Sequence, residues 1–316
     1  MGKFYYWRSG TGYEINLSAW PYQVVSEDGL GGPDTELYSH VVPLQDGSLY
    51  LGNRRLMRRF TIGLEIMGHS DVEVEEARQD LLAALNGQWG LGAFGRDRGG
   101  VRREVYCLPV NPPRFQAGLG DDLGFRDVVE FSAPDFAFYD PVERSVAANL
   151  DTQTDLVFAA TFPVRFGSSV IAASETATVY GDQPVYPVIT LTGPLTVPVV
   201  RNLTTGEVLD FAGGAGLVLI AGESAEIDCR PGFKTVTKQD GTNLVRYLTT
   251  DSDLVTFHLA PPPPSKGAVL GSIPPQMGVT QGVWATNGEN EMQLYGAAAT
   301  AASSLTVKWR DRWGGI

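Results

Sequence analysis

The chain has 316 residues, of which 43% are hydrophobic, and a formal net charge of -12 at pH 7. This length suits two ordinary domains, and the apolar content excludes a chain that is disordered throughout. The acidic balance disfavours sequence-specific nucleic acid readout, because binding to phosphates requires clustered Lys and Arg. Cys107 and Cys229 are the only cysteines, which excludes a disulfide framework and predicts two buried thiols.

The N-terminal sequence MGKFYYWR lacks the apolar core of a secretory signal, so we expect no export by that route. No uninterrupted apolar run approaches the roughly 20 residues that a membrane-spanning helix needs. We therefore expect a protein that is soluble or bound in an assembly and that does not span a membrane on its own.

Most predicted elements are short strands. Runs of β-branched and aromatic residues recur between Gly, Pro, Asn and Asp, which is typical of a mainly β protein. The clearest predicted strands are residues 60–67, 128–132, 186–191, 217–220, 244–248, 254–259 and 304–309. Apolar and polar residues alternate within them, which indicates that each strand buries one face.

One segment, between residues 70 and 87, follows helical spacing instead. Its apolar residues recur three or four positions apart, at Val74, Ala77, Leu81, Leu82 and Leu85. Ser70 and Glu73 match a capping box, and we expect Gly87 to stop the helix. The sequence predicts this one helix.

The domain boundary is expected after the Asp140–Pro141 turn. We predict an N-terminal domain at residues 1–145, a linker or arm at 146–184, where periodicity weakens, and a C-terminal domain at 185–316. Residues 261–282 begin with four prolines and are predicted to form a projecting loop, because a proline run cannot join a central strand.

Several segments together carry a family resemblance. In the last third they are YPVITLTGP at 186–194, RNLTTGE at 201–207, AGE at 221–223 before AEID at 225–228, QDGTN at 239–243, and LTVKWRDRWGGI at 305–316. The N-terminal half matches more loosely, at residues 44–50, 54–59 and 103–109 and at the predicted helix. These segments resemble the siphovirus distal tail protein family over nearly the whole chain, departing from it at the middle stretch and at residues 261–282.

The resemblance implies a β-rich N-terminal belt domain that closes a hexameric ring and a C-terminal galectin-like β-sandwich. It implies a structural hub that is made in the host cytoplasm and lies in the virion, at the tip of a long non-contractile phage tail, where it acts in host attachment and DNA ejection. The implied partners are further copies of the chain, the major tail tube protein, a tail-associated lysin or fibre hub protein, and receptor-binding proteins.

Two arginine pairs precede the predicted strand at 60–67, and Arg96, Arg98, Arg102 and Arg103 follow the helix. On an acidic protein such arginines are either solvated or paired within the chain, and each exposed pair contributes about 0–1 kcal/mol. The sharper hypothesis is pairing between ring subunits. The candidate ring-interface residues are Arg54, Arg55, Arg58 and Arg59.

No pattern of catalytic or cofactor-binding residues stands out. His40, His69 and His258 lie far apart, so we expect structural histidines and no metal site. Neighbouring carboxylates such as Glu75 and Glu76 diverge on a helix or strand. The sequence Gly213–Gly216 lacks the Lys that follows in a phosphate-binding loop and is predicted to be a turn. We expect no enzyme and no cofactor.

Trp284, beside the proline-rich loop, is the candidate for a surface contact with a partner, whereas the other tryptophans are expected mainly in the core. Exposed aromatic rings also stack on sugars. The alternative function is therefore a carbohydrate-binding module that recognises host cell-wall glycans. A cell-wall hydrolase with distant paired carboxylates is a third alternative.

Overall fold

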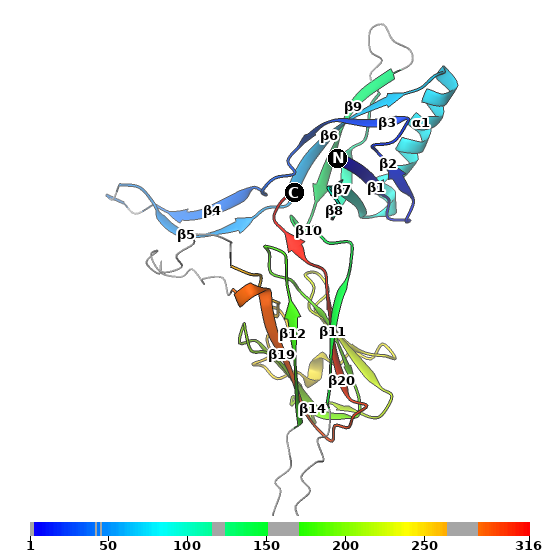
Figure 1. Ribbon diagram of the computed structural model, residues 1–316. Helices are drawn as coiled ribbons and strands as arrows, with labels where there is room; N and C mark the ends of the chain where they lie inside the picture. The colour runs from blue at the N-terminus through cyan, green and yellow to red at the C-terminus, as the bar shows by residue number, and fades with distance from the viewer. Residues whose placement is uncertain (1–2, 42, 45, 116–123, 151–170, 264–283) are drawn as a thin grey trace, which may run out of the picture. The chain divides into compact units, whose positions relative to one another are not determined.

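The computed structural model describes residues 3–41, 43–44, 46–115, 124–150, 171–263 and 284–316. The described residues form two compact units. The first unit contains the described residues up to Pro141 together with Arg312–Ile316, and the second contains the described residues of 142–263 and 284–311. Both are mainly antiparallel sheet, as predicted (Figure 1).

The first unit is built on a nine-stranded sheet, whose main path runs β2-β1-β7-β8-β9-β6-β3. Short strands β10 and β21 pair with each other beside β8. The strands are β1 (Lys3–Arg8), β2 (Glu14–Asn16), β3 (Tyr22–Asp28), β6 (Arg58–Met67), β7 (Gly92–Arg98), β8 (Val101–Asn111), β9 (Gly124–Ala133), β10 (Phe138–Tyr139) and β21 (Arg312–Trp313).

Aromatic packing forms the core of the first unit. The Phe60 and Phe131 rings stack with centroids 5.0 Å apart, and Trp7 and Phe94 pack beside them. Alternate residues of β6 point into this core, which is the period expected of a strand with one buried face. Trp7 Nε1 also donates to the carbonyl oxygen of Ala84 at 2.7 Å, which ties β1 to the helix.

The predicted helix is α1 (Asp71–Ala84), and Ser70 caps its N-terminus by accepting a hydrogen bond from the Glu73 amide. Glu73 in turn accepts from the His69 amide, one residue earlier than in a capping box. The prediction was wrong at Leu82, which is exposed. It was also wrong at Gly87, which begins the 3-10 turn η1 (Gly87–Trp89), because the helix has already ended at Ala84. No helix in the described part of the chain is long and apolar enough to cross a membrane.

The second unit is a sandwich of two five-stranded sheets. One sheet has the order β11-β20-β13-β17-β18, and the other has β12-β19-β14-β15 with β16 beside β14. Ile189, Leu191, Val200 and Leu294 from the two sheets share one core. The strands are β11 (Arg144–Asn149), β12 (Ile171–Thr178), β13 (Val188–Thr192), β14 (Leu195–Asn202), β15 (Val208–Asp210), β16 (Val218–Leu219), β17 (Ser224–Asp228), β18 (Thr235–Lys238), β19 (Glu289–Ala297) and β20 (Ser304–Trp309).

The domain limits differ from the predicted ones at both ends of the second unit. The predicted linker or arm at 146–184 contains β11 and β12, which pair with β20 and β19. Ala148, Ala173 and Ala177 are buried there, and such small side chains give little hydrophobic signal. Residues 312–316 belong to the first unit, not to the predicted C-terminal domain. Residues 151–170, and most of the predicted loop at 261–282, lie outside the described residues.

Two predicted strands were wrong. Residues 244–248 contain the 3-10 turn η2 (Val245–Tyr247), because the Asn243 side chain accepts from the Val245 amide and starts a turn. Residues 254–256 lie in another turn, in which the Asp253 carbonyl accepts from the Phe257 amide at 2.7 Å, and Leu259 makes an isolated bridge to Val185. Both segments alternate in sequence like strands, but local hydrogen bonds fix them as turns.

Candidate interaction surfaces

Strands β4 (Thr35–His40) and β5 (Leu49–Arg55) form a two-stranded sheet of their own in the first unit (Figure 1). Glu36 lies opposite Arg54 in this hairpin, and the carboxylate accepts from Arg54 Nε at 2.6 Å. The hydrogen bond to Glu36 raises the pKa of Arg54. The Arg54 guanidinium also lies 5.8 Å from the centre of the Tyr38 ring.

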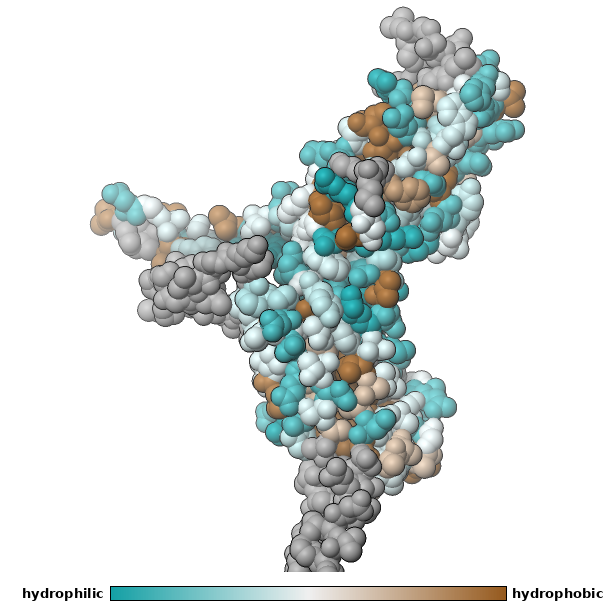
Figure 2. Space-filling model, viewed as in Figure 1, coloured by the Kyte–Doolittle hydropathy of each residue, from teal (hydrophilic) through white to brown (hydrophobic). Residues whose placement is uncertain are grey.

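Large apolar side chains are exposed along this hairpin. Leu37 is 65% exposed, Leu49 is 57% exposed and Leu51 is 54% exposed, and Val41 and Leu44 are exposed between the strands. Figure 2 shows brown, hydrophobic side chains along this part of the molecule. An isolated two-stranded hairpin is at best marginally stable in water, and an exposed apolar patch is typical of a surface that contacts a partner.

The four candidate arginines occupy different environments. Arg54 and Arg55 belong to the exposed hairpin, and Arg55 lies 4.9 Å from the centre of the Phe136 ring. Arg59 is exposed on β6. Arg58 is 1% exposed and donates to the carbonyl oxygens of Phe136, Gly29, Gly31 and Gly314. Burial lowers the pKa of Arg58. Because its guanidinium is used inside the chain, Arg58 is not an interface residue, contrary to the prediction.

One arginine of the second cluster, Arg102, lies beside a buried carboxylate in the first unit. Glu104 is 1% exposed, and it accepts from the Tyr6 hydroxyl at 2.6 Å and from Arg8 Nη2 at 2.7 Å. Arg102 lies 3.9 Å from the centre of the Tyr6 ring and donates to its hydroxyl. Burial and the hydrogen bond to Glu104 raise the pKa of Tyr6. The hydrogen bonds from Tyr6 and Arg8 to Glu104 therefore join β1 to β8.

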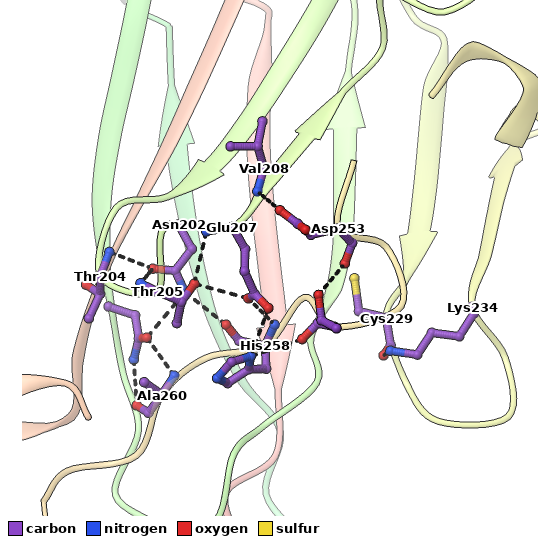
Figure 3. A network of polar contacts seen from close by, with 12 residues as sticks. Asn202, Thr204, Thr205, Glu207, Val208, Cys229, Lys234, Asp253, His258 and Ala260 are labelled. Carbon is purple, nitrogen blue, oxygen red and sulfur yellow. Dashed lines mark hydrogen bonds and ion pairs between the residues drawn. The ribbon is translucent and has the colours of Figure 1, made fainter. Parts of the chain in front are cut away.

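A polar network closes the loops at one end of the second unit (Figure 3). Glu207 accepts from the main-chain N–H of His258 at 2.8 Å, and its other oxygen lies 3.1 Å from His258 Nδ1. The buried side chain of Asn202 donates to the carbonyl oxygen of His258 at 2.9 Å. The buried Asn290 side chain pairs with both main-chain groups of Ala260. The network holds residues 258–260 against β14 and β19.

This network offers structural contacts and no assembled metal site. His258 is held by Glu207 and by the carbonyl oxygen of Thr256 at 3.0 Å from Nδ1. Lys234 donates to the carbonyl oxygen of Cys229, and burial raises the pKa of Cys229 to about 12. Among the described residues, no group of three or more His, Cys, Asp and Glu is arranged to hold a metal ion.

No protein-family model matches the sequence, and no curated protein matches it. The structure aligns with the crystal structure of the SPP1 Dit protein with a TM-score of 0.62, over 98% of both chains and at 10% identity. The chain shares the fold of SPP1 Dit. That protein is described as a paradigm of the hub adsorption apparatus in phages that infect Gram-positive bacteria.

Two structures of the phage P2 baseplate in its activated conformation, with Ca and with Sr, also align over 98% of both chains. Each has a TM-score of 0.49, at 8% and 9% identity. Because the identity to SPP1 Dit is only 10%, the similarity to that protein shows a shared fold and nothing more.

Within this Dit-like fold, the candidate contact residue Trp284 is 38% exposed in the second unit. The first unit exposes two tryptophans that were expected mainly in the core, Trp20 and Trp89, and both are more exposed than Trp284. Trp20 is 50% exposed, stacks on His69 with ring centroids 4.5 Å apart, and donates to Glu73 at 2.7 Å. No sequence pattern distinguishes Trp20 from Trp7, so only the packing separates the exposed ring from the buried one.

Proposed function

We propose that this chain is a structural hub protein at the tip of a long, non-contractile phage tail, where it forms a hexameric ring. The ring would join the tail tube protein to a tail-associated lysin or fibre hub protein and to receptor-binding proteins during host attachment and DNA ejection. The observation that carries the proposal is the fold shared with SPP1 Dit over 98% of both chains. A fold alone does not fix a function, so independent support is needed.

The hairpin supplies independent support for a ring. Its exposed leucines and its separate two-stranded sheet are features of an element that is completed by another chain. A head-to-tail interface between identical copies closes into a ring when the rotation per copy divides a full turn. We therefore propose that the hairpin takes part in ring closure and that the exposed Arg54, Arg55 and Arg59 lie near the subunit interface.

We propose a structural role for this chain and no catalysed reaction. Two of the three histidines make contacts within the units, since His69 stacks on Trp20 and His258 binds Glu207. The second unit, a two-sheet sandwich, would serve as the docking platform of the ring. We propose location in the virion, at the tail tip.

The test is native mass spectrometry of the full-length chain at low and moderate salt, with negative-stain microscopy of the same sample. We expect assemblies of six copies with a ring shape. A chain that stays monomeric at every concentration, and that binds cell-wall glycans on an array, would instead favour the carbohydrate-binding module. Clearing of labelled cell-wall material by the pure chain would contradict the structural role.

A further inference from the structure

A groove of about 470 Å³ lies at strand β3 in the first unit. Its lining includes six consecutive residues of this strand, Tyr22 to Glu27. Successive side chains of a strand point to opposite faces of the sheet, so a cavity that touches six in a row follows the edge of the strand. The groove is therefore an edge groove and not a depression on one face.

Both ends of the nine-stranded sheet border this groove. β3 is the last strand of the sheet path and pairs only with β6 among the described strands. Tyr5, from β1, and Ser18, just after β2, lie on the groove and come from the other end of the path. The Tyr5 hydroxyl donates to Glu27 across it. One row of main-chain N–H and C=O groups of β3 thus faces the groove instead of another described strand.

The lining chemistry suits a protein strand. Trp20 and Val25 are half exposed and supply apolar surface, and Gln23, Ser18 and Ser26 supply polar groups. An extended segment that pairs with a free sheet edge gains main-chain hydrogen bonds, and alternate side chains enter the neighbouring pockets. Glu27 lines the groove and Asp28 follows it, while the lining contains no Lys, Arg or His. The groove therefore favours a neutral or cationic strand.

The same chain carries a strand pair with the complementary properties. β4 and β5 each have one edge that no described strand covers. The hairpin exposes Leu37 and Leu51, and β5 ends in Arg54 and Arg55. We propose that the β3 groove receives one edge of the β4-β5 hairpin from a second copy of the chain. This interface rests on the proposed ring and identifies the two surfaces that each copy contributes.

Cross-linking between differently tagged copies tests the pairing. Cys107 and Cys229 are buried, so thiols introduced at the surface are the accessible ones. One copy carries Val25→Cys in the groove and the other carries Leu51→Cys on β5, and the two are coexpressed and treated with a short bismaleimide. We expect products that contain both tags, because the two thiols come together only between copies. If Val25→Cys prevents folding, Gln23→Cys replaces it.

The matched control replaces Leu51→Cys by Val218→Cys, which lies in the second unit and is equally exposed. We expect the groove and hairpin pair to give about ten-fold more product than this control, and Ser26→Trp, which fills the groove, to reduce that product. Rings without the cross-link would overturn the groove proposal and leave the proposed function standing. A monomeric chain would overturn both, and glycan fragments that block labelling of V25C would instead make the groove a sugar site.

Discussion

Arg58 joins distant parts of the first unit from a buried position. Its guanidinium donates at 2.7 Å to the carbonyl oxygen of Phe136 and at 2.9 Å to that of Gly29, and it also reaches Gly314. The centre of the Phe138 ring lies 4.6 Å from its guanidinium carbon. One side chain thus satisfies main-chain acceptors that belong to segments far apart in sequence, which makes it a stabilising residue and not a surface charge.

Removing this side chain should be costly. Arg58→Ala leaves buried carbonyl oxygens without donors, and we expect the free energy of unfolding to fall by about 2–4 kcal/mol. The neighbouring substitution Arg59→Ala removes an exposed arginine and should change it by less than about 0.5 kcal/mol. Urea titrations followed by tryptophan fluorescence measure both. Equal effects of the two substitutions would contradict the structural role of Arg58.

His258 makes the stability of the second unit depend on pH. Burial alone would lower its pKa, but the hydrogen bond and charge of Glu207 outweigh burial, and the pKa is raised above the ordinary value of 6.5. A histidine whose pKa is raised by folding binds protons more tightly in the folded state. Its stabilising contribution is therefore complete below the unfolded pKa and is lost as pH rises through the folded pKa.

We therefore expect the second unit to become easier to unfold with urea as the pH rises from 6.5 through the raised pKa of His258. His258→Gln should remove most of this dependence, because the amide keeps polar contacts but does not titrate. His69→Gln, an exposed histidine in the first unit, is the control and should leave it unchanged. An unaltered pH profile in His258→Gln would show that another group is responsible.

At the scale of elements, the β4-β5 hairpin combines regular pairing with an unusually apolar exposed surface. We expect Leu37→Ser, Leu49→Ser and Leu51→Ser together to abolish assembly while the chain remains folded, because these side chains are more than half exposed. The control converts Val218, Ile220 and Val255, which are equally exposed in the second unit, to Ser. Native mass spectrometry and far-ultraviolet circular dichroism give the two readouts. Assembly that survives in the leucine variant would contradict a role of the hairpin.

The elements that were predicted correctly from the sequence are those that are determined by their own residues. β6, β9 and β20 alternate over a core face, and α1 has its cap and its apolar face within one segment. The segment at 244–248 failed because a side-chain hydrogen bond from the Val245 amide to Asn243 overrides alternation. β12 failed for the opposite reason, since its alanines form a strand only because β19 pairs with them.

The sequence singles out some residues of the proposed interaction surfaces and not others. Runs of arginine singled out Arg54 and Arg55, but the same run included Arg58, whose burial depends on Gly314, 256 residues away. The groove at β3 could not be predicted from the sequence, because its lining residues Tyr5, Ser18 and Met67 come from separate segments. Features made by contacts between distant segments require the folded structure.

At the scale of the whole molecule, the chain passes from the first unit to the second after Pro141 and returns to the first before Arg312. The returning segment is firmly bound. Arg312 donates to both carboxylate oxygens of Asp135, at 2.8 and 2.7 Å, and β21 pairs with β10. The Ile316 amide donates to the carbonyl oxygen of Leu30 at 3.1 Å. The first unit is therefore completed by the last residues of the sequence.

Deleting residues 312–316 should consequently weaken the first unit and spare the second. The deletion leaves Asp135 without its bidentate partner and removes one acceptor of Arg58, and we expect a loss of about 2–4 kcal/mol in the unfolding of the first unit. Hydrogen exchange resolves the units, with faster exchange expected in β10 and unchanged exchange in β13 and β17. Arg312→Ala alone should give part of this effect. Faster exchange in the second unit instead would mean that the terminal segment stabilises the sandwich to which it is directly connected in sequence.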